Sequence, residues 1–151
     1  MSVGIGYDSH RFAEGRRLVL GGVEVEHELG LAGHSDADVL THAVIDALLG
    51  AAGMGDIGTL FPDDDERWRD ADSIDLLRTA VGTVSGRIVN IDATLICEQP
   101  PIGPLRAEME RILAEATSAR VSVKATSNEG MGWIGRGEGI ACIAVASVDS
   151  D

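Results

Sequence analysis

Aromatic residues are scarce in this sequence: they make up 3% of its 151 residues, although 44% are hydrophobic. The core therefore has to be built from Ala, Val, Ile and Leu, and a chain of this length suffices for one compact domain, residues 1–151. Cysteine is nearly absent as well, which argues against a disulfide framework. The two that exist, Cys97 and Cys142, fall in apolar, strand-like runs and are expected to be reduced core thiols, as in cytoplasmic proteins.

Positive charge is also in short supply. Against 25 Asp and Glu residues stand 12 Lys and Arg residues, so the formal net charge is −13. This balance excludes a nucleic-acid or anionic-membrane surface, because such partners need clustered basic residues. The sequence also lacks an apolar run of membrane-spanning length and a basic, apolar leader, so we expect a cytoplasmic protein without a membrane anchor. An anionic ligand would need bound cations, backbone amides and placed bases such as Lys124 and Arg136.

The hydrophobic periodicity predicts an α/β fold of the α+β type. Residues 3–8 alternate between apolar and small or polar side chains, which predicts a strand. The Gly21–Gly22 pair predicts a tight hairpin between residues 18–20 and 23–25, where the sheet begins antiparallel. Helices are expected over 36–52, 73–84 and from Pro104 onward, and further strands over 88–97, 121–126 and 140–148. The expected result is a mixed β-sheet with about three helices packed on one face.

Asp8, His10 and His42 are the most informative residues of the chain. Asp8 and His10 lie two positions apart in the predicted strand, so they project from the same face. His42 lies on a helix that is expected to start near Ser35 or Asp36 and to end around residues 50–53. Two nitrogens, one oxygen and an open coordination position are typical of a catalytic divalent metal rather than of a structural one.

The predicted helix also offers partners for His42 and leads into a long loop. Asp38 and Asp46 lie one turn on either side of His42, where either carboxylate could orient its second ring nitrogen. Residues 55–73 combine glycine, proline and acidic side chains, and long loops of this kind in compact domains are often functional. His34 precedes the helix, at a positive dipole end that would favour a phosphate oxygen.

The glycine-rich segment 130–139 is not predicted to bind a dinucleotide. GMGWIG at 130–135 matches G-x-G-x-x-G by letter, but a strand follows the glycines where that fingerprint requires a helix. The glycines are expected to let the backbone turn tightly near a ligand or a neighbouring subunit. Just before them, Thr126, Ser127 and Glu129 place two hydroxyls and a carboxylate at a strand end, where simple turn chemistry is an equal alternative.

Four ordered blocks carry a family resemblance over nearly the whole chain. They are GYDSHRF at 6–12, HSDADVLTHAVIDALLGAAGMGDIGTLFPD at 34–63, ADS at 71–73 and VKATSNEGMGWIGRGEGIACIAV at 123–145. In these blocks the chain resembles the 2-C-methyl-D-erythritol 2,4-cyclodiphosphate synthases of the non-mevalonate isoprenoid pathway. The resemblance implies a metal-dependent phosphorus–oxygen lyase that converts 4-diphosphocytidyl-2-C-methyl-D-erythritol 2-phosphate into the cyclic diphosphate and CMP.

The resemblance also implies an assembly and its cofactors. The family forms homotrimers with active sites between adjacent subunits, and an isoprenoid diphosphate is a candidate ligand of the trimer centre. It holds zinc or a similar divalent cation at one site, and magnesium or manganese bridges the substrate diphosphate at a second site. Both the trimer and the two metals are therefore expected here.

Residue roles follow by position. The resemblance implies metal ligands at Asp8, His10 and His42, a contact with the second metal at Glu129, and transition-state stabilisers at His34 and Ser127. Contacts with the ribose and methylerythritol parts fall on Ser35, Asp56, Gly58, Phe61, Asp63 and Asp65. The cytidine pocket falls on Cys97, Pro100, Ile102, Gly103, Ala125 and Thr126. The residues implied to face the trimer interior are Trp133 and Arg136.

Two positions depart from the family pattern. Ser127 stands where the family often has threonine, which keeps the hydroxyl, and Pro101 stands where lysine is frequent, which removes a cation from the nucleotide side.

Two other functions fit part of the sequence. Two histidines and one carboxylate also make the facial triad of non-haem iron oxygenases, although their all-β framework conflicts with the predicted helices. A trimeric binding protein for isoprenoid diphosphates, using Arg136 and the glycine segment, is the alternative without catalysis.

Overall fold

The computed structural model describes residues 1–149. Within these residues, seven strands, five helices and two short 3-10 turns follow one another. In order they are β1 (Ser2–Ala13), β2 (Leu18–Leu20), β3 (Val23–Val25), β4 (Gly30–Leu31), α1 (Val39–Ala52), α2 (Ile57–Leu60), η1 (Glu66–Trp68), α3 (Ser73–Thr83), β5 (Arg87–Ile96), η2 (Gly103–Leu105), α4 (Arg106–Thr117), β6 (Arg120–Thr126), α5 (Gly132–Gly135) and β7 (Gly139–Asp149).

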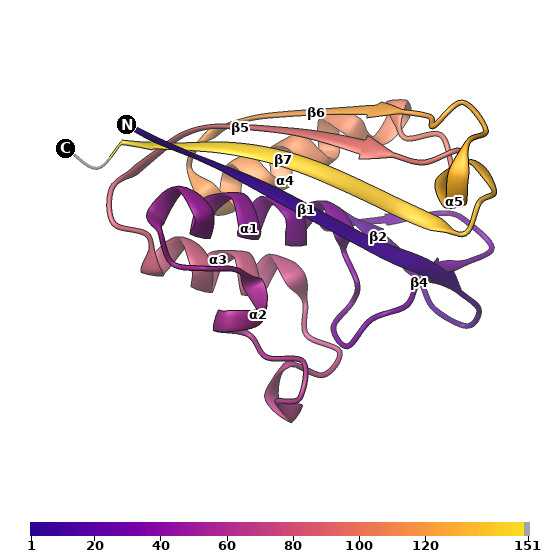
Figure 1. The fold of residues 1–151 in the computed structure, drawn as a ribbon, viewed down its shortest axis with the longest axis horizontal. Coiled ribbons are helices and arrows are strands. Elements are labelled where there is room, and N and C mark those ends of the chain that lie inside the picture. The colour runs from indigo at the N-terminus through magenta and orange to yellow at the C-terminus, as the bar shows by residue number, and fades with distance from the viewer. Residues whose placement is uncertain (150–151) are drawn as a thin grey trace.

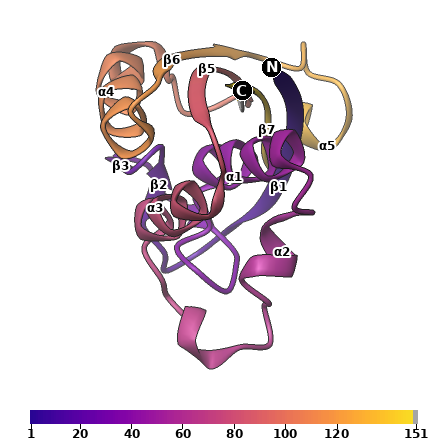
Figure 2. The same cartoon turned by 90° about the vertical axis from the view of Figure 1, so that its left-hand side faces the viewer.

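Five of the strands form one mixed sheet in the order β4-β1-β7-β5-β6, in which only β5 and β6 run parallel. The longer helices α1, α3 and α4 lie on one side of it, with α1 against β1 and β7, α4 against β6, and α3 beneath them (Figures 1 and 2). The predicted mixed sheet with helices on one face is confirmed. The hairpin at Gly21–Gly22 is also confirmed, but β2 and β3 pair only with each other, so the prediction that the main sheet begins there is wrong.

Glycine in β1 sets how closely α1 approaches the sheet. Gly4 and Gly6 face the helix, and a Cβ atom at these positions would lie 2.1 Å from the carbonyl oxygen of Ala47 and 2.0 Å from that of Ala43. The helix backbone therefore rests directly on the strand. Because alternate residues of a strand share a face, Asp8 continues the row of Gly4 and Gly6 toward the N-terminal part of α1.

Helix α1 begins later than the sequence predicted. Its first residue is Val39 and its N-cap is Asp38, whose carboxylate accepts hydrogen bonds from the amide and the hydroxyl of Thr41 at 3.0 and 2.7 Å. The same carboxylate accepts the amides of Gly21 and Gly22, each at 2.8 Å, so the hairpin fixes the cap. The predicted start near residues 35–36 is wrong, whereas the end is confirmed at Gly53, which has the left-handed conformation with φ of 70°.

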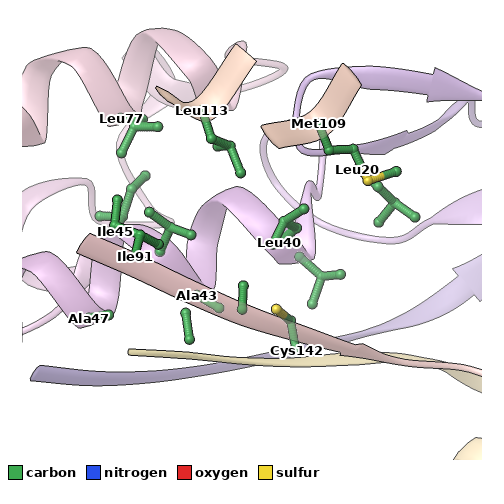
Figure 3. Close-up of a cluster of buried hydrophobic side chains, with 14 of the residues drawn as sticks. Leu20, Leu40, Ala43, Ile45, Ala47, Leu77, Ile91, Met109, Leu113 and Cys142 are labelled. Atoms are coloured by element: carbon green, nitrogen blue, oxygen red, sulfur yellow. The ribbon is translucent and has the colours of Figure 1, made fainter. Parts of the chain in front are cut away.

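The core is aliphatic, as the composition predicted. Figure 3 shows side chains of α1, α3, α4 and β5 meeting between the layers, among them Leu40, Ile45, Leu77, Ile91 and Leu113. Helix α1 is buried on nearly all sides because α3 covers the side away from the sheet, so even Thr41 and His42 lie inside. Within residues 1–149, both cysteines are free thiols in this interior.

The opposite face of the sheet is exposed and apolar where β1 and β7 form it. Val3, Ile5 and Tyr7 of β1 are 67%, 70% and 53% exposed. Their neighbours across the β1–β7 pair, Val145 and Ile143, are 39% and 38% exposed. A contiguous apolar patch of this kind on a sheet usually marks an interface.

The remaining predicted elements are found close to their expected positions. The helix expected over 73–84 is α3, and the strands expected over 88–97, 121–126 and 140–148 are β5, β6 and β7. The helix expected from Pro104 begins two residues later, after the turn η2. Among residues 1–149, no helix combines the length and the apolarity that a membrane crossing requires.

Candidate metal centre and active site

Asp8, His10 and His42 converge as the sequence predicted. The Asp8 Oδ2 atom lies 2.8 Å from His10 Nε2 and 3.2 Å from His42 Nδ1, and the two nitrogens are 3.3 Å apart. Strand β1 supplies two of these ligand atoms, and the close approach of α1 brings the third over the same face. The sequence periods of a strand and a helix therefore place one oxygen and two nitrogens around one point.

These three atoms fit a divalent cation better than a hydrogen-bonded cluster. Ligands about 2.05 Å from a tetrahedral zinc ion lie about 3.3 Å from one another, close to the observed separations. Within the described part of the chain, the buried Asp8 Oδ2 atom has no hydrogen-bond donor of suitable geometry. Moreover, His10 donates a hydrogen bond from its other nitrogen, Nδ1, to the carbonyl of Ala32 at 2.7 Å, which leaves the Nε2 lone pair free for a metal.

The protonation of the cluster reflects opposing effects. Burial alone raises the pKa of Asp8, but the close contacts with the His10 and His42 rings and their charges outweigh it, so the pKa lies below its usual value. Burial likewise lowers the pKa of His10, but the contact with Asp8 outweighs it and raises the pKa above its usual value. A metal ion at this site would therefore bind an ionised carboxylate and compete with a proton on His10.

The predicted partners of His42 are wrong. Asp38 caps α1 instead, and Asp46 accepts the amide of Ile57 at 2.7 Å, which anchors the start of α2. The Nε2 atom of His42 lies 2.8 Å from the hydroxyl of Ser73 and 3.2 Å from that of Ser35. The outer nitrogen is therefore contacted by Ser73 at the start of α3 and by Ser35 in the loop before α1, rather than by residues one helical turn away.

A pocket of about 350 Å³ opens beside the three ligands. It is lined by Asp8, His10, Gly33, His34, Ser35, His42, Ile57, Gly58, Phe61, Asp63, Trp68 and Leu76. Of the residues that the resemblance implied for this end of the site, the structure thus brings together His34, Ser35, Gly58, Phe61 and Asp63. The long loop predicted over 55–73 forms one wall and contains α2 and η1.

Two implied substrate residues lie outside this lining. Asp56 is exposed and caps α2 by accepting the amide of Thr59 at 2.9 Å, which lowers its pKa. The carboxylate of Asp65 binds the Arg67 side chain, which lowers its pKa, and its backbone carbonyl accepts a hydrogen bond from His34 Nε2 at 3.1 Å. Asp65 therefore holds His34 through its backbone.

Three apolar wall residues of the pocket were not predicted from the sequence: Ile57, Trp68 and Leu76. The ring of Trp68 contacts the ring of Phe61 edge to face, with centroids 4.9 Å apart. Trp68 could have been singled out, because a large aromatic side chain in a polar loop is unusual in a chain that has so few. Leu76 lies on α3 and carries no local signal, since its position in the pocket follows from the packing of α3 against α1.

The residues implied for the cytidine pocket form a second group. The amide of Cys97 donates to the carbonyl of Thr126 at 3.0 Å, so the loops after β5 and β6 lie side by side. The carboxylate of Glu98, another missed residue, accepts the amides of Asn128 at 2.9 Å and Gly130 at 3.2 Å and shapes the turn. The amide of Glu129 donates to the Ser127 hydroxyl at 3.2 Å.

This second group is far from the metal centre of the same chain. The sheet register runs from Ser9 in β1 through Ala141 and Ile96 to Thr126 in β6. Three strand spacings separate the ends of this row, a distance of about 14 Å. One chain therefore does not bring its Ser127 and Glu129 side chains to its own metal ligands.

Trp133 lines a separate cavity of about 640 Å³ at the end of the sheet, together with residues 9–12, Gly137 and Glu138. Arg136 lies next to this cavity, and its Nε atom donates to the Glu138 carboxylate at 2.8 Å. Neither residue lines the pocket at the metal centre. The residues that the resemblance implied thus lie in three separate regions: the pocket at the metal centre, the group around Cys97 and Thr126, and the cavity at Trp133.

Comparisons with known proteins identify the family of the chain. A family model described as the YgbB family matches residues 1–149. The chain is 53% identical over 156 residues to the 2-C-methyl-D-erythritol 2,4-cyclodiphosphate synthase of Salinibacter ruber, and the match covers 99% of each chain. It is 56% identical over 152 residues to the bifunctional enzyme IspD/IspF of an Anaeromyxobacter species, of which it spans only 39%. A solved 2C-methyl-D-erythritol-2,4-cyclodiphosphate synthase in its CDP-bound form superposes with a TM-score of 0.87 at 35% identity, over 97% of this chain and 99% of that one.

Proposed function

Because the chain belongs to the YgbB family and, within it, to the 2-C-methyl-D-erythritol 2,4-cyclodiphosphate synthases, we propose how its residues divide the work of that reaction. Its function is cyclodiphosphate formation in the non-mevalonate isoprenoid pathway. The proposed substrate is 4-diphosphocytidyl-2-C-methyl-D-erythritol 2-phosphate, and the proposed class is a phosphorus–oxygen lyase. An oxygen of the 2-phosphate forms a bond to the β-phosphorus, the bond from the β-phosphorus to the bridging oxygen breaks, and CMP leaves with that oxygen.

The convergence of Asp8 Oδ2, His10 Nε2 and His42 Nδ1 at the mouth of a pocket carries this proposal. A zinc-type cation held by these atoms would supply positive charge to the diphosphate oxygens as a Lewis acid. The same ligand set argues for an open coordination position, since three protein ligands are typical of catalytic sites. A non-haem iron oxygenase, the alternative for such a triad, is disfavoured because the chain belongs to a different family.

No side chain has to act as a nucleophile, because the substrate contains its own. The main task of the protein is to fold one flexible molecule back on itself, and such positioning can supply about 7–11 kcal/mol. His34 is well placed for this, since its ring lines the pocket and the carbonyl of Asp65 fixes its Nε2 atom. We assign the doubly protonated ring a hydrogen bond from Nδ1 to the diphosphate, which strengthens as charge develops.

The methylerythritol part is proposed to lie in the apolar end of the pocket. Ile57, Phe61 and Trp68 provide carbon surface for the methyl group, and Asp63 and the loop at Gly58 provide oxygen acceptors for the hydroxyls. Pockets that combine apolar walls with a few polar groups orient small ligands in this way.

A homotrimer would complete the site. The uncovered face of the sheet exposes Ile5 and Tyr7 beside Val145 and Ile143, which suits burial against other copies of the chain. In this proposal the loops 97–103 and 125–129 of one subunit face the metal centre of its neighbour. They would bind cytidine, with Ser127 donating to the diphosphate and Glu129 meeting a magnesium or manganese ion. Pro101 removes a cation that relatives often have at this pocket.

Three further assignments remain predictions from the sequence. Residues 1–151 are proposed to form a single synthase domain, and the cytoplasm is the expected compartment. The cavity at Trp133 would face the trimer centre and, with Arg136 nearby, could accept an isoprenoid diphosphate. Binding of such a ligand is proposed as a secondary property and not as the main function.

Replacement of His42 by Ala tests the proposal. We expect the variant to lose its bound metal and to release CMP from the pathway substrate at least about 100-fold more slowly, because it lacks one of three ligands. Metal per chain and CMP release are measured on the same sample. His27→Ala is the matched control, since His27 packs on Phe12 away from the pocket and should change neither quantity. Full retention of metal and activity in His42→Ala would refute the assignment.

A further inference from the structure

Both ring nitrogens of His42 have polar neighbours, and the contacts at Nε2 indicate which of the two nitrogens carries the proton. We propose that Ser73, backed by Asp36, is a positioning residue that holds His42 in the tautomer with the proton on Nε2 and the lone pair of Nδ1 turned toward the metal site. This inference rests on the proposed metal-dependent function and adds to it the residues that prepare the ligand. A histidine ligand is generally fixed by the hydrogen bond that its other nitrogen makes.

The contacts form a continuous chain of buried groups. The Ser73 hydroxyl lies 2.8 Å from His42 Nε2, and Ser73 is fully buried at the first residue of α3. The same hydroxyl donates to Oδ1 of Asp36, and the amide of Ser73 donates to Oδ2 of Asp36 at 3.0 Å. Both oxygens of Asp36 therefore bind one residue, which fixes the serine side chain and backbone together.

The chemistry of these groups determines where each proton lies. A serine hydroxyl has one hydrogen to donate, and an ionised carboxylate can only accept. The hydrogen of Ser73 therefore points to Asp36, and the oxygen of Ser73 has to accept from His42. This requires a proton on Nε2 of His42 and leaves Nδ1 as a lone pair, 3.3 Å from His10 Nε2 and 3.2 Å from Asp8 Oδ2.

Ser35 does not play the same part. Its hydroxyl is farther from His42 Nε2, at 3.2 Å, and no carboxylate fixes the direction of its proton. Asp36, in contrast, is held by the backbone, since its amide donates to the carbonyl of Ala71 at 3.1 Å and its carboxylate also accepts the amide of Asp38 at 3.2 Å. The loop before α1 and the loop before α3 are thus joined behind His42, and Ser73 is the link.

Metal affinity of the full-length protein, measured by competition with a zinc chelator, tests the proposal. We expect Ser73→Ala to weaken zinc binding by about 10- to 100-fold, the usual effect of removing the partner of a histidine ligand. Asp36→Asn should weaken it by about tenfold, because the amide and the hydroxyl of Ser73 donate to different oxygens of Asp36, and an NH2 group in place of one oxygen cannot accept a hydrogen bond. Thr117→Val is the matched control, since it removes a buried hydroxyl that donates a hydrogen bond to the carbonyl of Leu113 on α4, and it should leave zinc affinity unchanged.

A spectroscopic readout separates positioning from general loss of structure. Nitrogen-15 correlation spectra of the metal-free protein should show His42 protonated on Nε2 in the wild type and as a mixture of tautomers in Ser73→Ala. Zinc affinity within twofold of the wild type in both variants, or a wild-type His42 protonated on Nδ1, would overturn the proposal. If Ser73→Ala fails to fold, Asp36→Asn alone decides.

The proposed role of Ser73 and the proposed function can be refuted independently of each other. A wild-type protein that binds zinc but releases no CMP would refute the function, while the expected loss of zinc affinity in the variants would still support the role of Ser73. A wild-type protein that releases CMP, with unchanged zinc affinity in both variants, would refute the role of Ser73 and leave the function intact.

Discussion

At the scale of single residues, the candidate site depends on which nitrogen of each histidine is free. His10 donates a hydrogen bond from Nδ1 to the carbonyl of Ala32, and its Nε2 atom faces the metal site. His42 contacts Ser73 through Nε2, and its Nδ1 atom faces the metal site. The two imidazoles thus reach the same point through different atoms, one from a strand and one from a helix. A backbone carbonyl fixes one ring and a side-chain hydroxyl fixes the other, so the two ligands should respond differently to nearby substitutions.

Ser127 should affect turnover without affecting the metal. It lies across the sheet from Asp8, and its proposed role is a hydrogen bond to charge that develops on the diphosphate. We expect Ser127→Ala to lower kcat about 100-fold, the effect of removing one such donor, with the metal content unchanged. Steady-state CMP release and metal analysis of the same preparation measure the two quantities.

Ser127→Thr is the control for that experiment. It keeps the hydroxyl and adds one methyl group, so kcat should stay within about threefold of the wild type. Loss of metal in Ser127→Ala, or an equal loss of turnover in both variants, would contradict the assigned hydrogen bond.

The two cysteines should be unreactive in the folded protein. Burial, with a smaller effect from the charge of Glu98, raises the pKa of Cys97 to about 11, and burial also raises the pKa of Cys142, which lies in the core (Figure 3). At pH 8 the thiolate fraction of Cys97 is then about 100-fold lower than that of an ordinary thiol, and access is blocked as well. We expect a thiol reagent to modify the native protein at least about 100-fold more slowly than the urea-unfolded chain. Rapid modification of two thiols under native conditions would contradict their burial.

The types of the ligand residues could be predicted from the sequence, but their partners could not. Asp8 and His10 share a strand face, and His42 follows on the next helix, so two periodicities suffice to bring them together. The orientation of His42 by Ser73 depends on how α3 packs behind α1, which no local spacing encodes. Asp38 illustrates the same limit, because its predicted role at His42 was replaced by a cap that also serves the hairpin at Gly21.

At the scale of elements, the contact between α1 and β1 sets the geometry of the metal site. The strand offers Gly6 where the helix backbone passes, and a methyl group there would lie 2.0 Å from the carbonyl oxygen of Ala43, one residue after His42. A side chain at this position has to push the helix away. It therefore changes both the packing and the distance from His42 to Asp8.

Gly6→Ala should consequently destabilise the fold and weaken the metal site. We expect the free energy of unfolding to fall by about 3 kcal/mol, at the upper end of the cost of overpacking, and zinc affinity to fall with it. Urea unfolding and chelator competition measure the two effects. Gly82→Ala is the matched control, because Gly82 lies in α3 with open space around it, and alanine there should stabilise the helix by about 0.5–1 kcal/mol.

The late start of α1 shows why element boundaries were harder to predict than element types. Ser35 and Asp36 are good N-cap residues, and the sequence offers Asp38 just as readily. The choice is made by tertiary contacts, because Gly21 and Gly22 donate to Asp38, while Arg16 donates to the carbonyls of Gly33 and Ser35 and holds the preceding loop open. That loop carries His34 into the pocket, so the delayed start of the helix has a functional consequence.

At the scale of the whole molecule, the proposed site residues form two groups that lie on different strands of the sheet. The candidate metal ligands lie on β1 and α1, and the group around Ser127 and Glu129 lies about 14 Å away across three strand spacings. Local sequence patterns identified both groups but could not show that they are separated. The separation becomes useful only if another copy of the chain brings its own second group to the first, and the exposed apolar face of β1 and β7 offers the surface for that assembly.

Mixing two inactive variants tests this arrangement. His42→Ala lacks the metal group and retains Glu129, whereas Glu129→Ala retains the metal group. If each active site takes the metal group from one subunit and Glu129 from its neighbour, unfolding the two variants together and refolding them as an equal mixture should restore about one quarter of the sites, because one of four random pairings joins two intact halves. CMP release by the mixture, compared with each variant refolded alone, measures the recovery.

The exposed face provides the matching negative control. A carboxylate in the centre of the apolar patch, as in Ile5→Asp, should keep the chains apart because its burial against an apolar surface without a partner is unfavourable. Each subunit would then retain its own Asp8, His10 and His42 and still bind zinc, but the co-refolded pair carrying Ile5→Asp should recover no activity. Thr79→Asp, on the exposed side of α3, should leave the recovery intact. Recovery that persists in subunits shown to be monomeric by light scattering would mean that one chain closes its own site, and the shared-site arrangement would be wrong.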